Sequence, residues 1–249
     1  MSLLILLMNL LVSPTATAGE RPSELVTELR VVSMRYHENP ARLDEIREGL
    51  EREIKTNSHT ENLLALAQVC FIWGDIRAAT RDEKLEAYER GRQTAMRAVE
   101  LEPKNATAHF WYATNTGRWG QTNGVLSSLF FIPTLKREIA IILGLDPHLT
   151  SAYGLAGYFY YEVPGLFGGD LDTAEQMFRK GLKQDPTFTA LRVGLAKTLI
   201  KTDRIDEARR ELQAVLNEEE PHNLADWTLK DSQEARELLD SITHRSAER

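Results

Sequence analysis

Residues 110–182 read FWYATNTGRWGQTNGVLSSLFFIPTLKREIAIILGLDPHLTSAYGLAGYFYYEVPGLFGGDLDTAEQMFRKGL. Apolar and small residues recur in this stretch at helical spacing, and aromatic residues crowd the starts of two of the helical segments. Segments end in Leu-Asp-Pro or a variant of it, and two long glycine-containing inserts interrupt the pattern. The stretch therefore predicts an all-α protein built from helical hairpins.

Four prolines mark an internal repeat. Pro103, Pro147, Pro186 and Pro221 each follow an acidic residue near the end of a helical segment, at spacings of 44, 39 and 35 residues. The last spacing approaches the period of tetratricopeptide repeats, which is about 34 residues. The chain resembles this helical-repeat family, and the resemblance implies a solenoid of stacked helix pairs with long inserts in the hairpin turns.

The repeat register divides the chain into segments. The expected repeats and flanking elements are 60–103, 106–147, 150–186 and 189–221, an N-terminal hairpin at 22–56 and a closing helix at 230–243. Small residues such as Gly157, Ala196 and Ala208 occupy the positions where two helices of a repeat approach closely. No helix pair can bury its apolar face alone, so residues 19–249 are expected to form one solenoid domain.

Extra residues are expected in three hairpin turns. The turn of repeat 106–147 is longer than the consensus over Gly120–Ile132, and the turn of repeat 60–103 is longer still. A shorter insert surrounds the motif Pro164, Gly165, Gly168, Gly169 and Asp170. Its glycines lack the spacing and the lysine of a phosphate-binding loop. This insert is predicted to be a turn before a helix, with Asp172 as the cap and Glu175 completing a capping box.

Composition and residue spacing exclude several functions. The net charge of −7 and the dispersed basic residues argue against a nucleic-acid partner. No two of the six histidines are spaced for one metal ion on a helix face, and no nucleophile motif is present. Cys70 lies on an apolar helix face and is expected to be a packed thiol. The prediction is a non-enzymatic protein without catalytic residues, metal or cofactor.

The first helices of the repeats are expected to line a concave groove. In tetratricopeptide repeats the second, fifth, ninth and twelfth positions of the first helix face this groove. Those positions hold Leu64, Gln68, Phe71, Phe110, Thr114, Gly117, Tyr158, Tyr161, Lys197 and Ile200. The candidate binding residues are Phe71, Phe110, Thr114, Tyr158, Tyr161 and Lys197. Two interpretations stay open: an aromatic binding groove, or aromatics that the inserts fold over and bury.

Residues 60–220 resemble TatT, the T component of tripartite ATP-independent periplasmic (TRAP) transporters. The resemblance rests on the aromatic helix FWYATNTGRWG, the link IPTLKREI and the segment PGLFGGD followed by a helix with the pattern A-x-x-x-F. It implies an exported helical protein, a trimer, a periplasmic solute-binding protein as partner, and a groove suited to an apolar small ligand. The alternative is a general protein- or peptide-binding scaffold unrelated to transport.

A second, weaker resemblance is to the repeat domain of regulators of microtubule dynamics. It rests on the Tyr-Glu-Val step at 161–163, directly after an aromatic helix. The predicted export signal favours the first resemblance over this one.

The N-terminus is expected to be a signal peptide. Leu3–Val12 is an apolar run broken only by Asn9, and Ala16-Thr17-Ala18 forms a small-residue cleavage site. The run is about half the ~20 residues that span a bilayer. Cleavage after residue 18 would leave an exported, periplasmic chain, and no lipobox cysteine is present for a lipid anchor. The alternative is a buried N-terminal helix.

Overall fold

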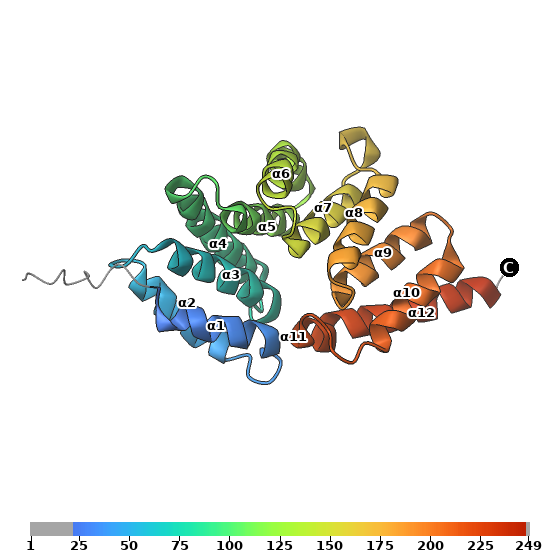
Figure 1. The fold of residues 1–249 in the computed structure, drawn as a ribbon, viewed down its shortest axis with the longest axis horizontal. Helices are drawn as coiled ribbons and strands as arrows, with labels where there is room; N and C mark the ends of the chain where they lie inside the picture. The colour runs from blue at the N-terminus through green and yellow to red at the C-terminus, as the bar shows by residue number, and fades with distance from the viewer. Residues whose placement is uncertain (1–21, 248–249) are drawn as a thin grey trace, which may run out of the picture.

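The computed structural model describes residues 22–247, and the predicted signal peptide at 1–18 lies outside them. Within residues 22–247 the chain is helical and contains no β-strand, which confirms the predicted all-α repeat fold. Consecutive helices pack as antiparallel hairpins that stack side by side into a curved arch (Figure 1).

The helices follow one another with short connections. They are α1 (Glu24–Arg35), α2 (Arg42–Glu53), α3 (Thr60–Ile76), α4 (Arg81–Leu101), α5 (Ala106–Asn123), α6 (Val125–Leu145), α7 (Thr150–Glu162), α8 (Leu171–Gln184), α9 (Thr189–Lys201), α10 (Ile205–Leu216), α11 (Leu224–Asp226) and α12 (Ser232–Ala247). A short 3₁₀ helix, η1 (Gly165–Phe167), precedes α8, and a π-helical turn, η2 (Trp227–Asp231), joins α11 to α12.

Extra residues of the two larger inserts lengthen helices rather than turns. α5 ends at Asn123 and α6 begins at Val125, so Gly124 is the single residue between them, with a φ of 115°. The predicted long turn over Gly120–Ile132 is therefore wrong. Its residues extend both helices by added turns, because a glycine in the left-handed region reverses the chain in one step. In repeat 60–103 the extra residues likewise lengthen a helix instead of the turn. Helix α4 has 21 residues, and only residues 77–80 connect α3 to α4.

Helix starts follow ordinary capping chemistry, with one correction. Thr80 and Glu83 form a reciprocal capping box at the start of α4. The cap of α8 is Asp170, whose side chain accepts a hydrogen bond from the Thr173 backbone N–H at 2.6 Å. The predicted Asp172 cap is wrong, because α8 already begins at Leu171 and Asp172 lies inside its first turn.

Tight contacts between helices set the core of the C-terminal half. Phe178 of α8 is fully buried, and its ring lies between Gly157 of α7 and Gly194 of α9. A Cβ added to either glycine would approach the Phe178 ring to 2.5 Å. The predicted close approach at Gly157 is thus present, and it depends on the absence of a side chain there.

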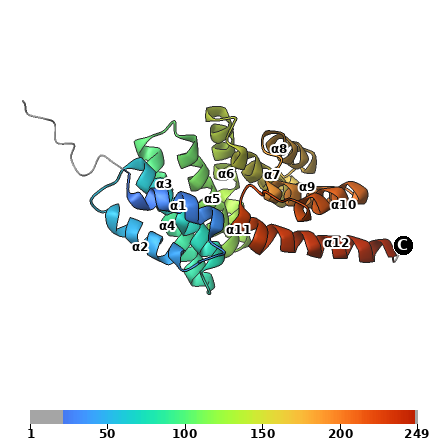
Figure 2. The same ribbon diagram turned by 60° about the horizontal axis from the view of Figure 1, so that its bottom comes forward.

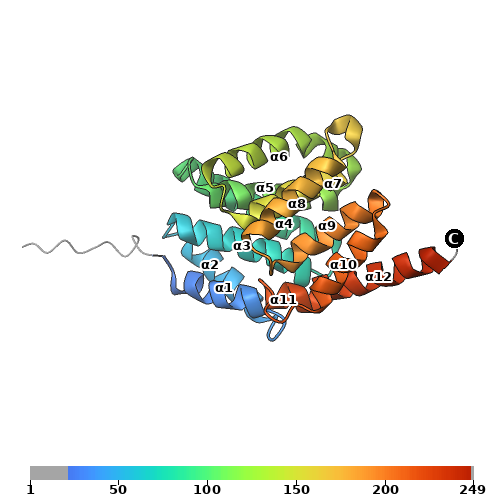
Figure 3. The ribbon, with the colours of Figure 1, turned by 45° about the vertical axis from the view of Figure 1, so that its right-hand side comes forward.

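Helix α6 connects the two halves of the arch. Its inward residues Ile139 and Ile142 are buried against Ala113 of α5 and against Ala152 and Ala156 of α7. The opposite face of α6 looks outward from the top of the arch (Figures 1 and 3).

The arch closes where α1 meets α11 (Figures 1 and 2). The Tyr36 hydroxyl after α1 donates a hydrogen bond to Asp226 of α11 at 2.6 Å. The Asn223 amide donates to the backbone carbonyl of Ser33 at 3.0 Å. These bonds link residues 190 positions apart in sequence, so the solenoid curves back on itself.

Candidate binding site on the inner side of the arch

Helices α3, α5, α7 and α9 face the inner side of the arch, and α11, η2 and α12 lie across its open end (Figure 1). The glycine-containing insert at η1 and the helical insert of α5 and α6 lie on the outer side (Figures 1 and 3). The inserts therefore do not cover the predicted groove. The C-terminal elements narrow it instead.

An ionic cluster joins the two ends of the arch on this inner side. We use this name for Asp75, Tyr88, Arg118, Asp226 and Lys230. The Asp75 carboxylate accepts hydrogen bonds from the Arg118 Nε at 3.1 Å and from the Tyr88 hydroxyl at 2.6 Å. The Lys230 ammonium lies 3.3 Å from Asp75 and 3.1 Å from Asp226. One buried carboxylate thus holds α3, α4, α5 and η2 together.

The charges of this cluster stabilise one another. Burial alone would raise the pKa of Asp75, but the Arg118 guanidinium and the Lys230 ammonium outweigh it and lower that pKa. Burial alone would lower the pKa of Lys230, but Asp226 and Asp75 raise it. The cluster is therefore charged at neutral pH, and each member depends on the others for its partner.

Beside the ionic cluster lies an aromatic cluster, formed by Phe71, Tyr88, Phe110 and Trp111. The Phe71 ring centre lies 5.8 Å from that of Trp111 and 6.4 Å from that of Tyr88, and Phe110 meets Trp111 edge-on at 5.0 Å. The Arg118 guanidinium stands 5.9 Å from the Phe71 ring centre. Phe71 and Phe110, predicted as groove residues, are thus brought together, and both are half-buried.

The other predicted residue of α5, Thr114, is not part of either cluster. It is half-buried, and its hydroxyl is buried without a hydrogen-bond partner among the described atoms. Nothing in its surroundings supports a binding role.

A tyrosine–lysine cluster lies further along the inner side, formed by Tyr158, Tyr161, Lys197 and Lys201. The Lys201 ammonium lies 3.7 Å from the Tyr161 ring centre, and Lys197 lies 5.6 Å from the same ring. Lys197 also forms an ion pair of 2.8 Å with Glu234 of α12. The structure therefore brings together Tyr158, Tyr161 and Lys197, as the repeat register predicted, and adds Lys201 to them.

The two tyrosines differ in their surroundings. Tyr158 packs edge-on against Phe178 at 5.1 Å, and its hydroxyl donates to the Ala190 carbonyl at 3.0 Å. Burial raises the pKa of Tyr158 well above its ordinary value. Tyr161 instead presents its ring to two lysines. Both rings are half-buried and pack against the core of the C-terminal half, and Tyr161 in addition has two lysine ammonium groups beside its ring.

The glycines of the insert motif are required by the conformation and close packing of the backbone. Gly168 has a φ of 100°, which only glycine adopts readily, and a Cβ on Gly169 would lie 1.6 Å from the Val163 carbonyl oxygen. Asp170 caps α8, and its backbone N–H donates to the Tyr160 carbonyl at 2.9 Å. These contacts give Gly168, Gly169 and Asp170 a structural role. Pro164 and Gly165 form the start of η1.

Asp231, at the end of η2, is a buried carboxylate that the sequence does not single out. The Thr189 hydroxyl of α9 donates a hydrogen bond to it at 2.6 Å. Burial raises the pKa of Asp231 to about 6; the Asp226 and Glu234 carboxylates also raise it, while the Thr189 hydroxyl and Lys230 lower it.

Asp231→Asn is expected to stabilise the protein at neutral pH and to leave its stability unchanged below pH 4. In the unfolded chain the Asp231 pKa is near its ordinary 3.8, so between pH 4 and 6 the folded state binds more protons. The free energy of unfolding of the wild type therefore falls as the pH rises through this window. The fall is roughly 2–3 kcal/mol, because the Asp231 pKa differs by about two units between the folded and the unfolded chain. Melting temperatures measured from pH 4 to pH 8 test this, with Asp240→Asn on the exposed side of α12 as the control. A constant difference at all pH values would contradict it.

A buried pair on the outer side of α5 also escaped the sequence analysis. The His109 Nδ1 lies 2.6 Å from the Glu138 carboxylate of α6, and Nε2 lies 3.0 Å from the Pro103 carbonyl. His109 lies between two acceptor groups. It holds α5 to α6.

Other features of the described residues offer no chemistry. A hollow of about 780 Å³ lies between α1 and α2 and is lined mainly by charged side chains, Glu28, Arg42 and Glu45 among them, which does not suit an apolar ligand. Within residues 22–247 no group of three His, Cys, Asp or Glu side chains could hold a metal ion. Cys70 is fully buried, as expected of a packed thiol. None of the helices in this range combines the length and apolarity that a bilayer crossing requires.

Two sequence families match the chain. The family described as regulator of microtubule dynamics protein 1-3 matches residues 34–167, and the tetratricopeptide repeat family matches residues 168–230. No curated protein matches the chain.

Solved structures of repeat proteins share the fold. A thermophilic TPR protein of Thermus thermophilus superposes with a TM-score of 0.62 at 17% identity, covering 84% of this chain and 98% of that protein. MamA from Desulfovibrio magneticus, residue 41 to its end, superposes with a TM-score of 0.50 at 15% identity, covering 79% of this chain and 96% of that one. At these identities the likeness concerns the fold alone.

Proposed function

The chain belongs to the regulator of microtubule dynamics protein 1-3 family, and from this premise we propose that it is a non-enzymatic scaffold that binds a protein segment on the inner side of its arch. The tetratricopeptide fold supports protein–protein interaction in general. The family match favours the weaker of the two resemblances, since it covers the aromatic helices and the Tyr-Glu-Val step at 161–163.

The observation that carries the proposal is the Tyr161 ring with Lys197 and Lys201 beside it. The Tyr161 ring supplies apolar contact area, and the Lys201 ammonium, 3.7 Å from the ring centre, supplies a positive charge that attracts a carboxylate, whereas Lys197 is already paired with Glu234. This combination suits a partner segment with an apolar side chain next to an acidic one. Anchors of this kind contribute most of the energy of an interface.

Replacing the two tyrosines separately distinguishes binding from folding. Tyr161→Ala is expected to weaken binding by ~2 kcal/mol, about thirtyfold, with little change in melting temperature. Tyr158→Ala is expected to lower the free energy of unfolding by roughly 3 kcal/mol, because its ring packs against Phe178.

The probe is a short peptide, obtained by selecting a random displayed library for binding to the wild-type chain. Its affinity for each variant is measured by fluorescence anisotropy. Selected peptides should combine acidic and apolar side chains. Equal affinity for the wild type and Tyr161→Ala, or a large loss of stability in Tyr161→Ala, would place the binding surface elsewhere.

A narrower form of the proposal is an accessory role in TRAP solute uptake. The resemblance of the PGLFGGD segment to TatT supports it, together with the apolar run and cleavage motif of residues 1–18. The partner would be a periplasmic solute-binding protein, and the mature chain would begin at Gly19. Isolation from the native host tests both points at once: a chain with intact Met1 and no co-isolated solute-binding protein would exclude this role.

The family description favours a second partner, because it associates its members with microtubule dynamics. Co-sedimentation with assembled microtubules tests this directly. Pelleting of the wild type but not of Tyr161→Ala would identify microtubules as the partner of the inner side, and no pelleting of either would exclude them.

A further inference from the structure

The outer face of α6 exposes large apolar side chains at the top of the arch. Val125, Leu126 and Phe130 are 76%, 84% and 77% exposed. In η1, on the same outer edge (Figures 1 and 3), Leu166 is 88% and Phe167 47% exposed. Contiguous exposed apolar side chains on a soluble domain usually mark an interaction surface.

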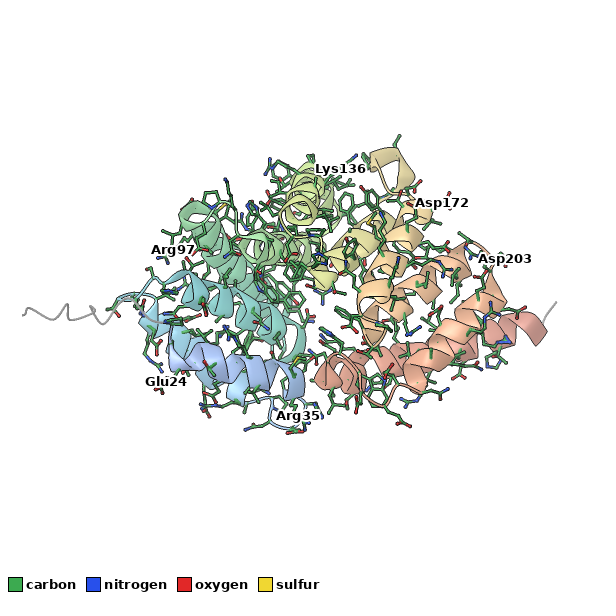
Figure 4. All side chains as sticks on the ribbon, in the orientation of Figure 1. Glu24, Arg35, Arg97, Lys136, Asp172 and Asp203 are labelled. Atoms are coloured by element: carbon green, nitrogen blue, oxygen red, sulfur yellow. The ribbon has the colours of Figure 1, made fainter. Side chains whose placement is uncertain are left out.

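The charge on this face has one sign. Residues 119–135 contain no charged side chain, and the first charges after them are Lys136 and Arg137. The one acid of α6, Glu138, is buried against His109 and also pairs with Arg137 at 3.2 Å, while the Arg137 side chain stays 63% exposed. Lys136 is exposed on the outer edge of the arch (Figure 4), and its ammonium lies 3.8 Å from the position of a Cβ on Gly168 beside η1. The outward face of α6 is thus apolar and basic, in a chain with a net charge of −7.

Carboxylates near this edge are engaged elsewhere. Glu162 accepts a hydrogen bond from Gln121, Asp170 caps α8, and Asp172 lies on the side of α8 away from Lys136 (Figure 4). The exposed charged side chains of α6 itself are Lys136 and Arg137.

We propose that the outer face of α6, together with η1, docks on an anionic lipid surface. A helix that lies in a bilayer interface has large apolar side chains on one face, bordered by basic residues, and this is the pattern of α6. The apolar side chains stand on the outer edge of the arch, where they can enter a flat lipid surface. Lys136, exposed at this edge, supplies attraction to anionic headgroups, and the exposed guanidinium of Arg137, next to Glu138, adds to it. This surface is separate from the inner side, so both can be occupied at once.

An environment-sensitive fluorophore on the full chain tests the proposal directly. It is attached through Leu126→Cys on α6 or, as a matched control, through Val31→Cys, which is 65% exposed on α1 at the opposite edge. Cys70 is fully buried and so remains unlabelled. Vesicles of phosphatidylcholine alone are compared with vesicles that also contain phosphatidylserine. The expected result is a blue-shifted, brighter emission at position 126 with the anionic vesicles and none at position 31.

Paired substitutions then measure the contribution of the face. Leu126→Ser with Phe130→Ser should weaken partitioning into anionic vesicles at least tenfold, since each buried side chain contributes about 1.5 kcal/mol or more. Val31→Ser with Met34→Ser should leave it unchanged.

Three outcomes would overturn the proposal. Equal emission changes at positions 31 and 126 would indicate non-specific adsorption. No change at position 126 with either kind of vesicle would show that the face does not enter lipid. A change at position 126 that follows protein concentration without vesicles would identify a second copy of the chain as the occupant.

Discussion

Gly157→Leu is expected to lower the free energy of unfolding by roughly 3 kcal/mol or more, the upper end for overpacking a tight core. Even a single Cβ at this position would lie 2.5 Å from the Phe178 ring. The ring has little room to move away, because Gly194 of α9 also approaches it so closely that an added Cβ there would lie 2.5 Å from it. Relief requires α7 and α9 to separate, which would expose the core of the C-terminal half.

The matched control is Gly144→Leu on α6. Gly144 is also helical, but a Cβ there has no neighbour within 4 Å. This substitution should be neutral or slightly stabilising, since leucine favours a helix more than glycine does. Urea unfolding followed by circular dichroism compares the two variants. Similar stabilities would show that α7 and α9 do not hold Phe178 as described.

Asp75→Ala is expected to destabilise the protein by about 3 kcal/mol and to open the arch. The Asp75 side chain is 6% exposed and is the common partner of Arg118, Tyr88 and Lys230. Removing one partner from a buried ionic cluster leaves the remaining charges uncompensated, at a cost of roughly 3–5 kcal/mol. The lower figure applies here, because Arg118 and Lys230 keep part of their hydration.

Energy transfer between dyes at Val31→Cys and Leu229→Cys reports the separation of α1 from η2. The efficiency should fall in Asp75→Ala, because Lys230 of η2 loses its partner on α3. Asp44→Ala is the control: Asp44 also binds an arginine, Arg77, but it joins α2 to α3 and is one-third exposed. It should cost less stability and leave the energy transfer unchanged. Unaltered transfer in Asp75→Ala would show that the ionic cluster does not close the arch.

Part of the geometry of the candidate site could be predicted from the sequence. Repeat register placed Tyr158, Tyr161 and Lys197 on one surface, and the structure brings them within contact of one another. Register succeeds there because residues three or four apart on a helix share a face, and consecutive hairpins stack in a fixed order. Register could not show that Tyr158 also packs edge-on against Phe178, since that contact depends on the next helix.

The helical repeat could be predicted from the sequence, because helical spacing, turn residues and small positions are local signals that each hairpin carries within a few tens of residues. The closure of the arch, by contrast, could not be predicted from local sequence patterns, because it depends on contacts between distant residues. Asp75 and Lys230 are 155 residues apart, and neither lies in a motif. Their contact results from the small rotation between successive hairpins, which accumulates along the stack and returns η2 to α3. The same accumulation directs the α6 face outward, where its apolar residues remain exposed instead of joining the core.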